Sequence, residues 1–77
     1  MDNRDKILAI LKRVAKKSAV PEDGESLFDS GFLDSFALPD VVAELEQEFG
    51  IQIPDADLNP RKFESVARIT EYVESRM

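Results

Sequence analysis

Residues 38–54 read Leu-Pro-Asp-Val-Val-Ala-Glu-Leu-Glu-Gln-Glu-Phe-Gly-Ile-Gln-Ile-Pro, and this stretch decides the fold. Its apolar residues recur at the spacing of one helix face, which predicts an amphipathic helix over residues 38–49. Because Pro39 lacks an N–H, we expect the regular helix to start at Pro39. Gly50 suits a left-handed C-cap. Pro54 then ends a short extended link.

Two further helices and one helical turn are predicted on either side of this stretch. Residues 2–17 carry an apolar stripe behind a cap at Asp2 or Asn3, and residues 66–74 carry another behind a cap at Ser65. Residues 55–58 are expected to form a single helical turn before the break at Asn59-Pro60. The expected fold class is all-α: a small four-helix bundle of three main helices plus one short helix, forming a single domain over residues 1–77.

The first loop is long, covering residues 18–34, and its Pro, Gly, Ser and Asp content predicts irregular structure. It also contains five large apolar side chains, which need burial: Val20, Leu27, Phe28, Phe32 and Leu33. We therefore expect the loop to wrap across the core.

The absent residue types exclude most enzyme classes. The 77 residues contain no Cys and no His, which removes thiolate nucleophiles, zinc–cysteine sites and the usual general base. Asp55-Ala56-Asp57-Leu58-Asn59 begins like a calcium loop, but Pro60 and Val66 stand where that loop needs Gly and Glu, so no metal site is expected. No apolar run is long enough for a membrane span, and the N-terminus shows no signal-peptide pattern. We expect a cytoplasmic monomer that is not an enzyme.

The charge of −6 is unevenly distributed. Residues 21–58 hold eleven carboxylates and no Lys or Arg, which disfavours nucleic acid and favours a basic protein partner. In the predicted helix Asp40, Glu44 and Glu48 form one continuous row, with Glu46 on the other flank. Such a row costs helix stability, with no Lys or Arg in the helix to offset it. Reversing Asp40 or Glu44 to Lys is therefore expected to leave thermal stability level or raise it. A solvated acidic face kept for solubility is the alternative.

The acidic helix is preceded by the segment Gly31-Phe32-Leu33-Asp34-Ser35-Phe36. Asp34 or Ser35 could serve as an ordinary helix N-cap. If the helix starts at Pro39, Ser35 instead lies just before it with an exposed hydroxyl. A serine without a base is not a nucleophile on its own, but it can be the substrate of another enzyme.

In this context the chain resembles the acyl carrier protein family. The resemblance rests on Asp34-Ser35-Phe36, on Leu45-Glu46-Gln47-Glu48-Phe49, on Ile51-Gln52-Ile53-Pro54 and on Phe63-Glu64-Ser65-Val66. It implies that a phosphopantetheinyl transferase attaches 4′-phosphopantetheine from coenzyme A to Ser35, beside Asp34. It also implies that partner enzymes with basic surfaces meet Asp34, Asp40 and Glu46, with Val42 as the apolar contact; Glu44 belongs to the same acidic row. Departures from the family are Ala37 in place of an acid and Pro39 inside the helix.

The resemblance implies a phosphoprotein that carries acyl groups as thioesters between a loading ligase and downstream transferases, in lipid or fatty acid biosynthesis. The spacing from Gly31 to Asp34 is more like that of D-alanyl carriers, so an aminoacyl cargo is the alternative. A non-carrier acidic interaction module is a further alternative. An acyl chain would need a pocket among six apolar residues: Phe28, Phe32, Val42, Leu45, Phe63 and Ile69.

Overall fold

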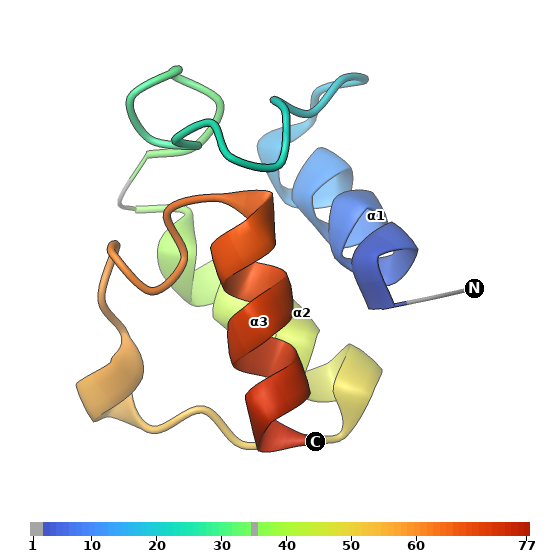
Figure 1. The fold of residues 1–77 in the computed structure, drawn as a ribbon, viewed down its shortest axis with the longest axis vertical. Coiled ribbons are helices and arrows are strands. Elements are labelled where there is room, and N and C mark those ends of the chain that lie inside the picture. The colour runs from blue at the N-terminus through green and yellow to red at the C-terminus, as the bar shows by residue number, and fades with distance from the viewer. Residues whose placement is uncertain (1–2, 35) are drawn as a thin grey trace.

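The predicted apolar stripes form one shared core. The computed structural model describes residues 3–34 and 36–77, which contain three α-helices and no strand: α1 (Asn3–Ala15), α2 (Leu38–Phe49) and α3 (Val66–Arg76). α1 packs against both α2 and α3 (Figure 1). Each helix contributes fully buried side chains, including Ile7, Val41 and Ile69. Burying such a side chain is worth about 1.5–3 kcal/mol, so the core stabilises the bundle. The all-α prediction is confirmed.

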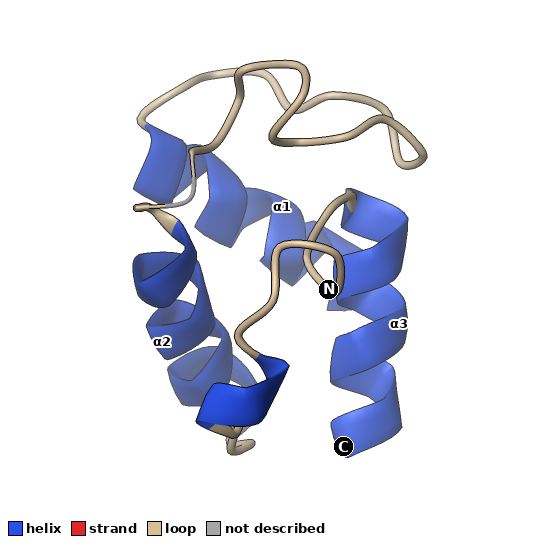
Figure 2. Ribbon diagram, turned by 90° about the vertical axis from the view of Figure 1, so that its left-hand side faces the viewer, coloured by secondary structure: helices blue, strands red, loops and turns tan. Residues whose placement is uncertain are grey.

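The expected short fourth helix is only a turn. Residues 55–57 form one 3₁₀ turn, η1 (Asp55–Asp57), which follows the extended link after α2 (Figure 2). Pro54 precedes it in extended backbone, with φ −63° and ψ 150°. The hydrogen bond from the Leu58 N–H to the Asp55 carbonyl closes the turn, and the break at Asn59-Pro60 stops it from growing.

The first helix is shorter than expected because Lys16 adopts the left-handed conformation, with φ 57°. The Lys17 N–H donates to the Lys12 carbonyl at 3.2 Å, which completes a Schellman-type end after Ala15. α2 ends in the same way at Gly50, with φ 64°, and its N–H donates to the Glu46 carbonyl, as predicted. Glycine adopts this conformation without cost, whereas a lysine is strained in it.

Lys16→Gly is therefore expected to stabilise the protein by about 0.5–1 kcal/mol, because glycine removes the strain at a left-handed position. Lys12→Gly is the matched control: it lies inside α1, where glycine costs about 1 kcal/mol. Urea unfolding of both variants measures the difference. Equal destabilisation by both would show that the left-handed end carries no strain.

The first loop crosses one end of the bundle and is held there by hydrogen bonds to α3 and the segment before it (Figure 1). The Leu27 N–H donates to the Glu64 carbonyl at 2.6 Å, and the Ala67 N–H donates to the Asp23 carbonyl at 3.0 Å. Leu27, Phe32 and Leu33 are buried, which confirms that the loop contributes to the core. Arg4 of α1 also pairs with the Asp23 carboxylate at 2.6 Å and holds the pKa of that carboxyl below its usual range.

A polar cluster fastens η1 to α3. The Tyr72 hydroxyl donates to one Asp57 oxygen at 2.6 Å, and the Lys62 ammonium pairs with the other at 2.7 Å. The hydrogen bond from Lys62, followed by that from Tyr72, lowers the pKa of Asp57. Burial, followed by the hydrogen bond to Asp57, raises the pKa of Tyr72 to about 12. The Tyr72 ring packs edge-on against Phe63, with the ring centroids 5.2 Å apart.

The raised pKa of Tyr72 predicts a loss of stability in alkali. A group whose folded pKa lies above its unfolded value of about 10 contributes stability that is complete below pH 10 and disappears as the pH rises through 12. Thermal melts across that range are expected to show a steeper fall for the wild type than for Tyr72→Phe. The substitution leaves every other ionisable side chain in place, so the difference isolates the phenol. Parallel falls would contradict the assignment.

Candidate functional site

Ser35, the residue proposed for modification, lies outside the described residues, but its two neighbours belong to a well-defined turn. One oxygen of the Asp34 carboxylate accepts hydrogen bonds from the Phe36 and Ala37 N–H groups, both at 3.0 Å. The Ala37 N–H is also 3.1 Å from the Asp34 carbonyl oxygen. Asp34 thus caps the turn that leads into α2, and the side chain fixes the backbone on the far side of Ser35.

This turn differs from an ordinary N-cap of α2. The helix begins at Leu38, one residue before the predicted Pro39, and its N-cap is Ala37, which makes no side-chain cap. Pro39 lies in the first helical turn, where a missing N–H has no cost. The Asp34 carboxylate supplies the capping oxygen from one turn further back.

Phe36 is the site residue that the sequence analysis missed. Its side chain is 88% exposed, although most large apolar side chains of the chain are buried. The available signal was its position, because it belongs to no helical stripe and follows Ser35 directly. An exposed phenyl ring next to a candidate modification site offers an apolar contact to a partner protein.

Among the predicted acidic contacts, Asp40 and Glu44 border the same shallow hollow on the α1–α2 side of the molecule. Asp40 is exposed. The Glu44 carboxylate pairs with Arg13 of α1 at 3.1 Å. α2 itself contains no Lys or Arg, as expected, but at Glu44 an offsetting cation comes from α1. A Glu44→Lys reversal would place two cations together, so level or higher stability is expected for Asp40→Lys alone.

The other two predicted contacts are largely engaged in the fold. The Glu46 carboxylate accepts a hydrogen bond from the Ile53 N–H at 2.8 Å, which ties the extended link to α2. Val42 is only 6% exposed and belongs to the core. Next to Ser35, Phe36 offers far more apolar surface than Val42.

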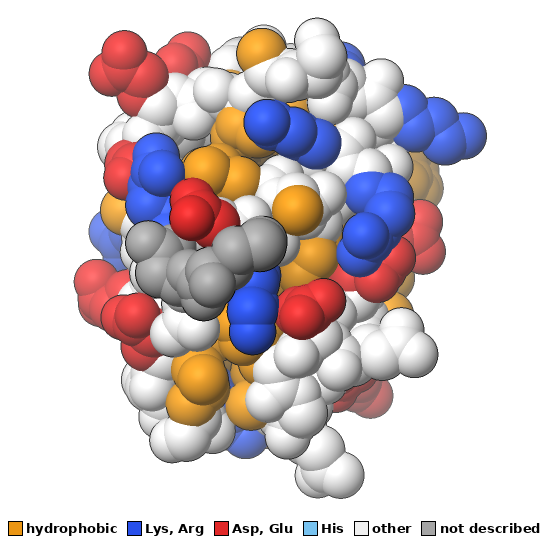
Figure 3. Space-filling view, turned by 90° about the vertical axis from the view of Figure 1, so that its right-hand side faces the viewer, with side chains coloured by type: hydrophobic (Ala, Val, Ile, Leu, Met, Phe, Trp, Pro, Cys, Tyr) orange, Lys and Arg blue, Asp and Glu red, His pale blue; other side chains and the backbone are white. Residues whose placement is uncertain are grey.

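The surface around α2 contrasts with other faces of the molecule. α2 contains no Lys or Arg, whereas α1 carries four basic residues. The face that includes the N-terminal end of α1 shows basic and acidic side chains interspersed (Figure 3). α2 itself therefore carries acidic side chains and no basic ones.

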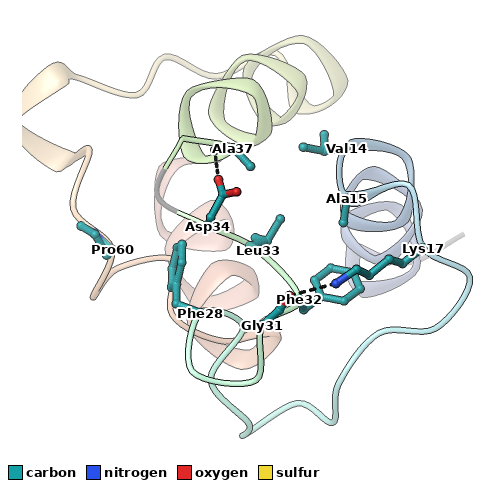
Figure 4. A pocket seen from close by; sticks show the side chains of 10 residues that line it. All are labelled: Val14, Ala15, Lys17, Phe28, Gly31, Phe32, Leu33, Asp34, Ala37 and Pro60. Carbon is teal, nitrogen blue, oxygen red and sulfur yellow. Dashed lines mark hydrogen bonds between the residues drawn. The ribbon is translucent and has the colours of Figure 1, made fainter.

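A groove of about 690 Å³ opens beside the turn that holds Asp34 (Figure 4). The end of α1, the first loop, the N-cap residue before α2 and the segment after η1 contribute its walls. The lining residues are Val14, Ala15, Lys17, Phe28, Gly31, Phe32, Leu33, Asp34, Ala37 and Pro60.

The groove differs from the predicted cargo pocket. Of the six residues named for that pocket, only Phe28 and Phe32 line the groove. Leu45, Phe63 and Ile69 are fully buried, and they pack against other core residues. The sequence shows that all six residues are apolar. It does not distinguish side chains that fill the core from those that border a groove.

Among the described residues, no helix is both long and apolar enough to cross a membrane. The same residues contain no group of three or more Asp or Glu side chains placed to hold a metal ion.

Comparison with known proteins gives the family. The chain matches the family described as phosphopantetheine attachment site over residues 5–73. It is 28% identical to the D-alanyl carrier protein of Lactobacillus acidophilus over 75 residues, covering 97% of this chain and 95% of that one. The D-alanyl carrier protein of Leuconostoc mesenteroides is also 28% identical over 75 residues, with 97% and 96% covered. The acyl carrier protein of Thermotoga maritima is 32% identical over 83 residues, with 100% and 99% covered.

The family match covers all of α2, η1 and the first loop and most of α1 and α3, so it includes every part of the site described above. Family members bear 4′-phosphopantetheine covalently and are carriers that do not themselves catalyse. The chain belongs to the phosphopantetheine attachment site family.

Proposed function

We propose that Ser35 is the attachment point for 4′-phosphopantetheine and that the protein carries a short acyl or aminoacyl cargo between partner enzymes. The observation that carries this proposal is the turn around Ser35. The Asp34 carboxylate holds the backbone N–H groups of Phe36 and Ala37, and Phe36 presents an exposed ring directly after the serine in the sequence.

The residue types at the site suit a covalently attached 4′-phosphopantetheine arm. When bound, the arm supplies the thiol that this Cys-free chain lacks, and the cargo is held on that thiol as a thioester. The chain contributes the serine hydroxyl, the turn that presents it and the surface that partners recognise. The Asp34 carboxylate is occupied by two backbone N–H groups, which makes it a positioning residue in this proposal.

A short cargo is favoured over a long fatty acyl chain. The central side chains Leu45, Phe63 and Ile69 are fully buried, and a long chain would have to displace them. D-alanyl carrier proteins are among the relatives that span nearly the whole chain, and an acyl carrier protein is another. Fatty acyl transport is the second candidate because of that acyl carrier relative.

Loading assays separate the two cargo classes. The phosphopantetheine-bearing protein is incubated with ATP and either a D-alanine-activating ligase or a long-chain acyl ligase, and its intact mass is measured. The proposal expects faster loading with the amino acid. Faster loading with the long chain, together with shifted NMR signals of Leu45 and Ile69, would favour the fatty acyl alternative.

We further propose that α2 is the surface on which the phosphopantetheinyl transferase and the loading ligase dock through basic patches. Asp40 and Phe36 are the main contacts in this proposal, since both are exposed near Ser35. Glu44 contributes through its half-exposed carboxylate, which Arg13 partly neutralises. Glu46 and Val42 lie at the margin of the surface. The Glu46 carboxylate accepts the hydrogen bond from Ile53, and Val42 is buried.

Asp40→Lys is expected to slow phosphopantetheine transfer several-fold at low salt, because it places a cation where a basic partner docks. The effect should shrink as the ionic strength rises past about 0.1 M. Glu71→Lys is the matched control, since it makes the same charge change on an exposed position of α3. Initial transfer rates at several salt concentrations provide the measurement. Equal slowing by both variants would indicate a net-charge effect and no docking surface.

A further inference from the structure

The function proposed above assigns no role to the groove beside Asp34. It begins at the turn that carries Ser35, because Asp34 and Ala37 both line it and lie on either side of that serine in the sequence. It then extends to Val14 and Ala15 at the end of α1 and to Lys17 just beyond that helix (Figure 4). A flexible group attached at Ser35 would therefore start at the rim of the groove.

The walls of the groove suit a chain of mixed apolar and amide character. Val14, Ala15, Phe28 and Leu33 provide apolar surface. A volume of about 690 Å³ lies within the roughly 300–1,000 Å³ that is typical of small-molecule pockets. The pantetheine part of the arm consists of a dimethyl-substituted carbon, two amides and a terminal thiol. Its apolar and polar groups therefore suit a groove that is lined by both kinds of residue.

One wall of the groove is held in place by Lys17. Its ammonium donates to the Gly31 carbonyl at 2.9 Å and lies 5.5 Å from the centre of the Phe32 ring. These contacts join the end of α1 to the first loop on the side of the groove away from α2. The groove therefore exists before any ligand arrives, which lowers the cost of filling it.

We propose that this groove holds the protein's own phosphopantetheine arm between encounters with partner enzymes. The proposal rests on Ser35 being the attachment point. Attachment at the rim converts binding into an intramolecular event with an effective concentration in the millimolar range. A groove affinity of about the same magnitude is then enough to hold the arm roughly half of the time.

The direct test is NMR of the protein bearing an isotope-labelled pantetheine arm. Nuclear Overhauser effects from the dimethyl group of the arm to Val14, Ala15 or Phe32 are expected. Effects confined to α3 and the far side of α2, or none to the protein, would overturn the proposal. Intact mass is recorded first: a protein that gains no arm would overturn the proposed function, and this inference with it. A protein that gains the arm without these contacts overturns the inference alone.

A second test blocks the groove. Ala15→Phe fills the end of the groove at α1, and Ala43→Phe is the matched control because Ala43 is exposed and lines the separate hollow beside Asp40. With the arm attached, the terminal thiol is expected to react with a maleimide about two-fold faster in Ala15→Phe than in wild type and at the wild-type rate in Ala43→Phe. Circular dichroism verifies that both variants fold. Equal rates in all three folded proteins would contradict the proposal.

Discussion

Ser35→Ala is expected to abolish phosphopantetheine transfer completely while leaving the protein folded. Transfer requires the serine hydroxyl as the accepting atom, and alanine has none. The fold does not require that hydroxyl in this account, because Asp34 caps the turn with its own carboxylate. Loss of a capping serine costs at most about 0.5–2 kcal/mol. Intact mass after incubation with coenzyme A and the transferase measures the modification, and circular dichroism measures the fold.

Three further substitutions make the Ser35 test more specific. Ser30→Ala removes another serine of the first loop and is expected to accept the arm at the wild-type rate. Asp34→Asn retains an oxygen acceptor for the turn, whereas Asp34→Ala removes it, so the alanine variant should lose more stability and more transfer than the asparagine variant. A mass gain in Ser35→Ala, or an unfolded Ser35→Ala protein, would show that the assignment of Ser35 is wrong.

Phe63→Ala is expected to cause the largest loss of stability of any substitution described here. Phe63 is fully buried and packs edge-on against Tyr72, where it joins the segment after η1 to α3. Truncation of a buried phenylalanine costs about 3–5 kcal/mol. A domain of this length has about 4–12 kcal/mol in total, so the variant is expected to be close to unfolding at 25 °C.

Phe36→Ala is the control for Phe63→Ala, because it makes the same chemical change at a ring that is 88% exposed. Its stability should lie within about 0.5 kcal/mol of wild type. Its rate of phosphopantetheine transfer should fall, since the ring belongs to the proposed docking surface. Urea unfolding of both variants gives the comparison. A similar loss of stability in both would mean that the two rings do not differ in burial as described.

The sequence was sufficient to predict the features that depend on local pattern. The apolar stripes of α2 and α3 set their positions, Gly50 set the end of α2, and Ser65 accepts a hydrogen bond from the Arg68 N–H as its cap should. The apolar residues of the first loop indicated burial, and Leu27 and Phe32 are buried. Each of these outcomes follows from helical periodicity or from a residue's own conformational preference.

The features that could not be predicted depend on contacts between distant segments or on local strain. The pairing of Arg13 with Glu44 joins residues of two helices that are 31 positions apart in the sequence. The Glu46 carboxylate meets Ile53 only because the chain turns back after Gly50. α1 ends early because Lys16 adopts a conformation that lysine rarely takes. Likewise, the groove beside Asp34 exists only once α1, the loop and α2 have packed together.

The most direct test of the central claim is to locate the modification on the unaltered protein. No Lys or Arg lies between Lys17 and Arg61, so trypsin releases one peptide, residues 18–61, with four serines: Ser18, Ser26, Ser30 and Ser35. After incubation with coenzyme A and a phosphopantetheinyl transferase, this peptide is fragmented in the mass spectrometer. The account predicts a gain of one phosphopantetheine located on Ser35. Its location on one of the other three serines, or no gain with several transferases, would contradict it.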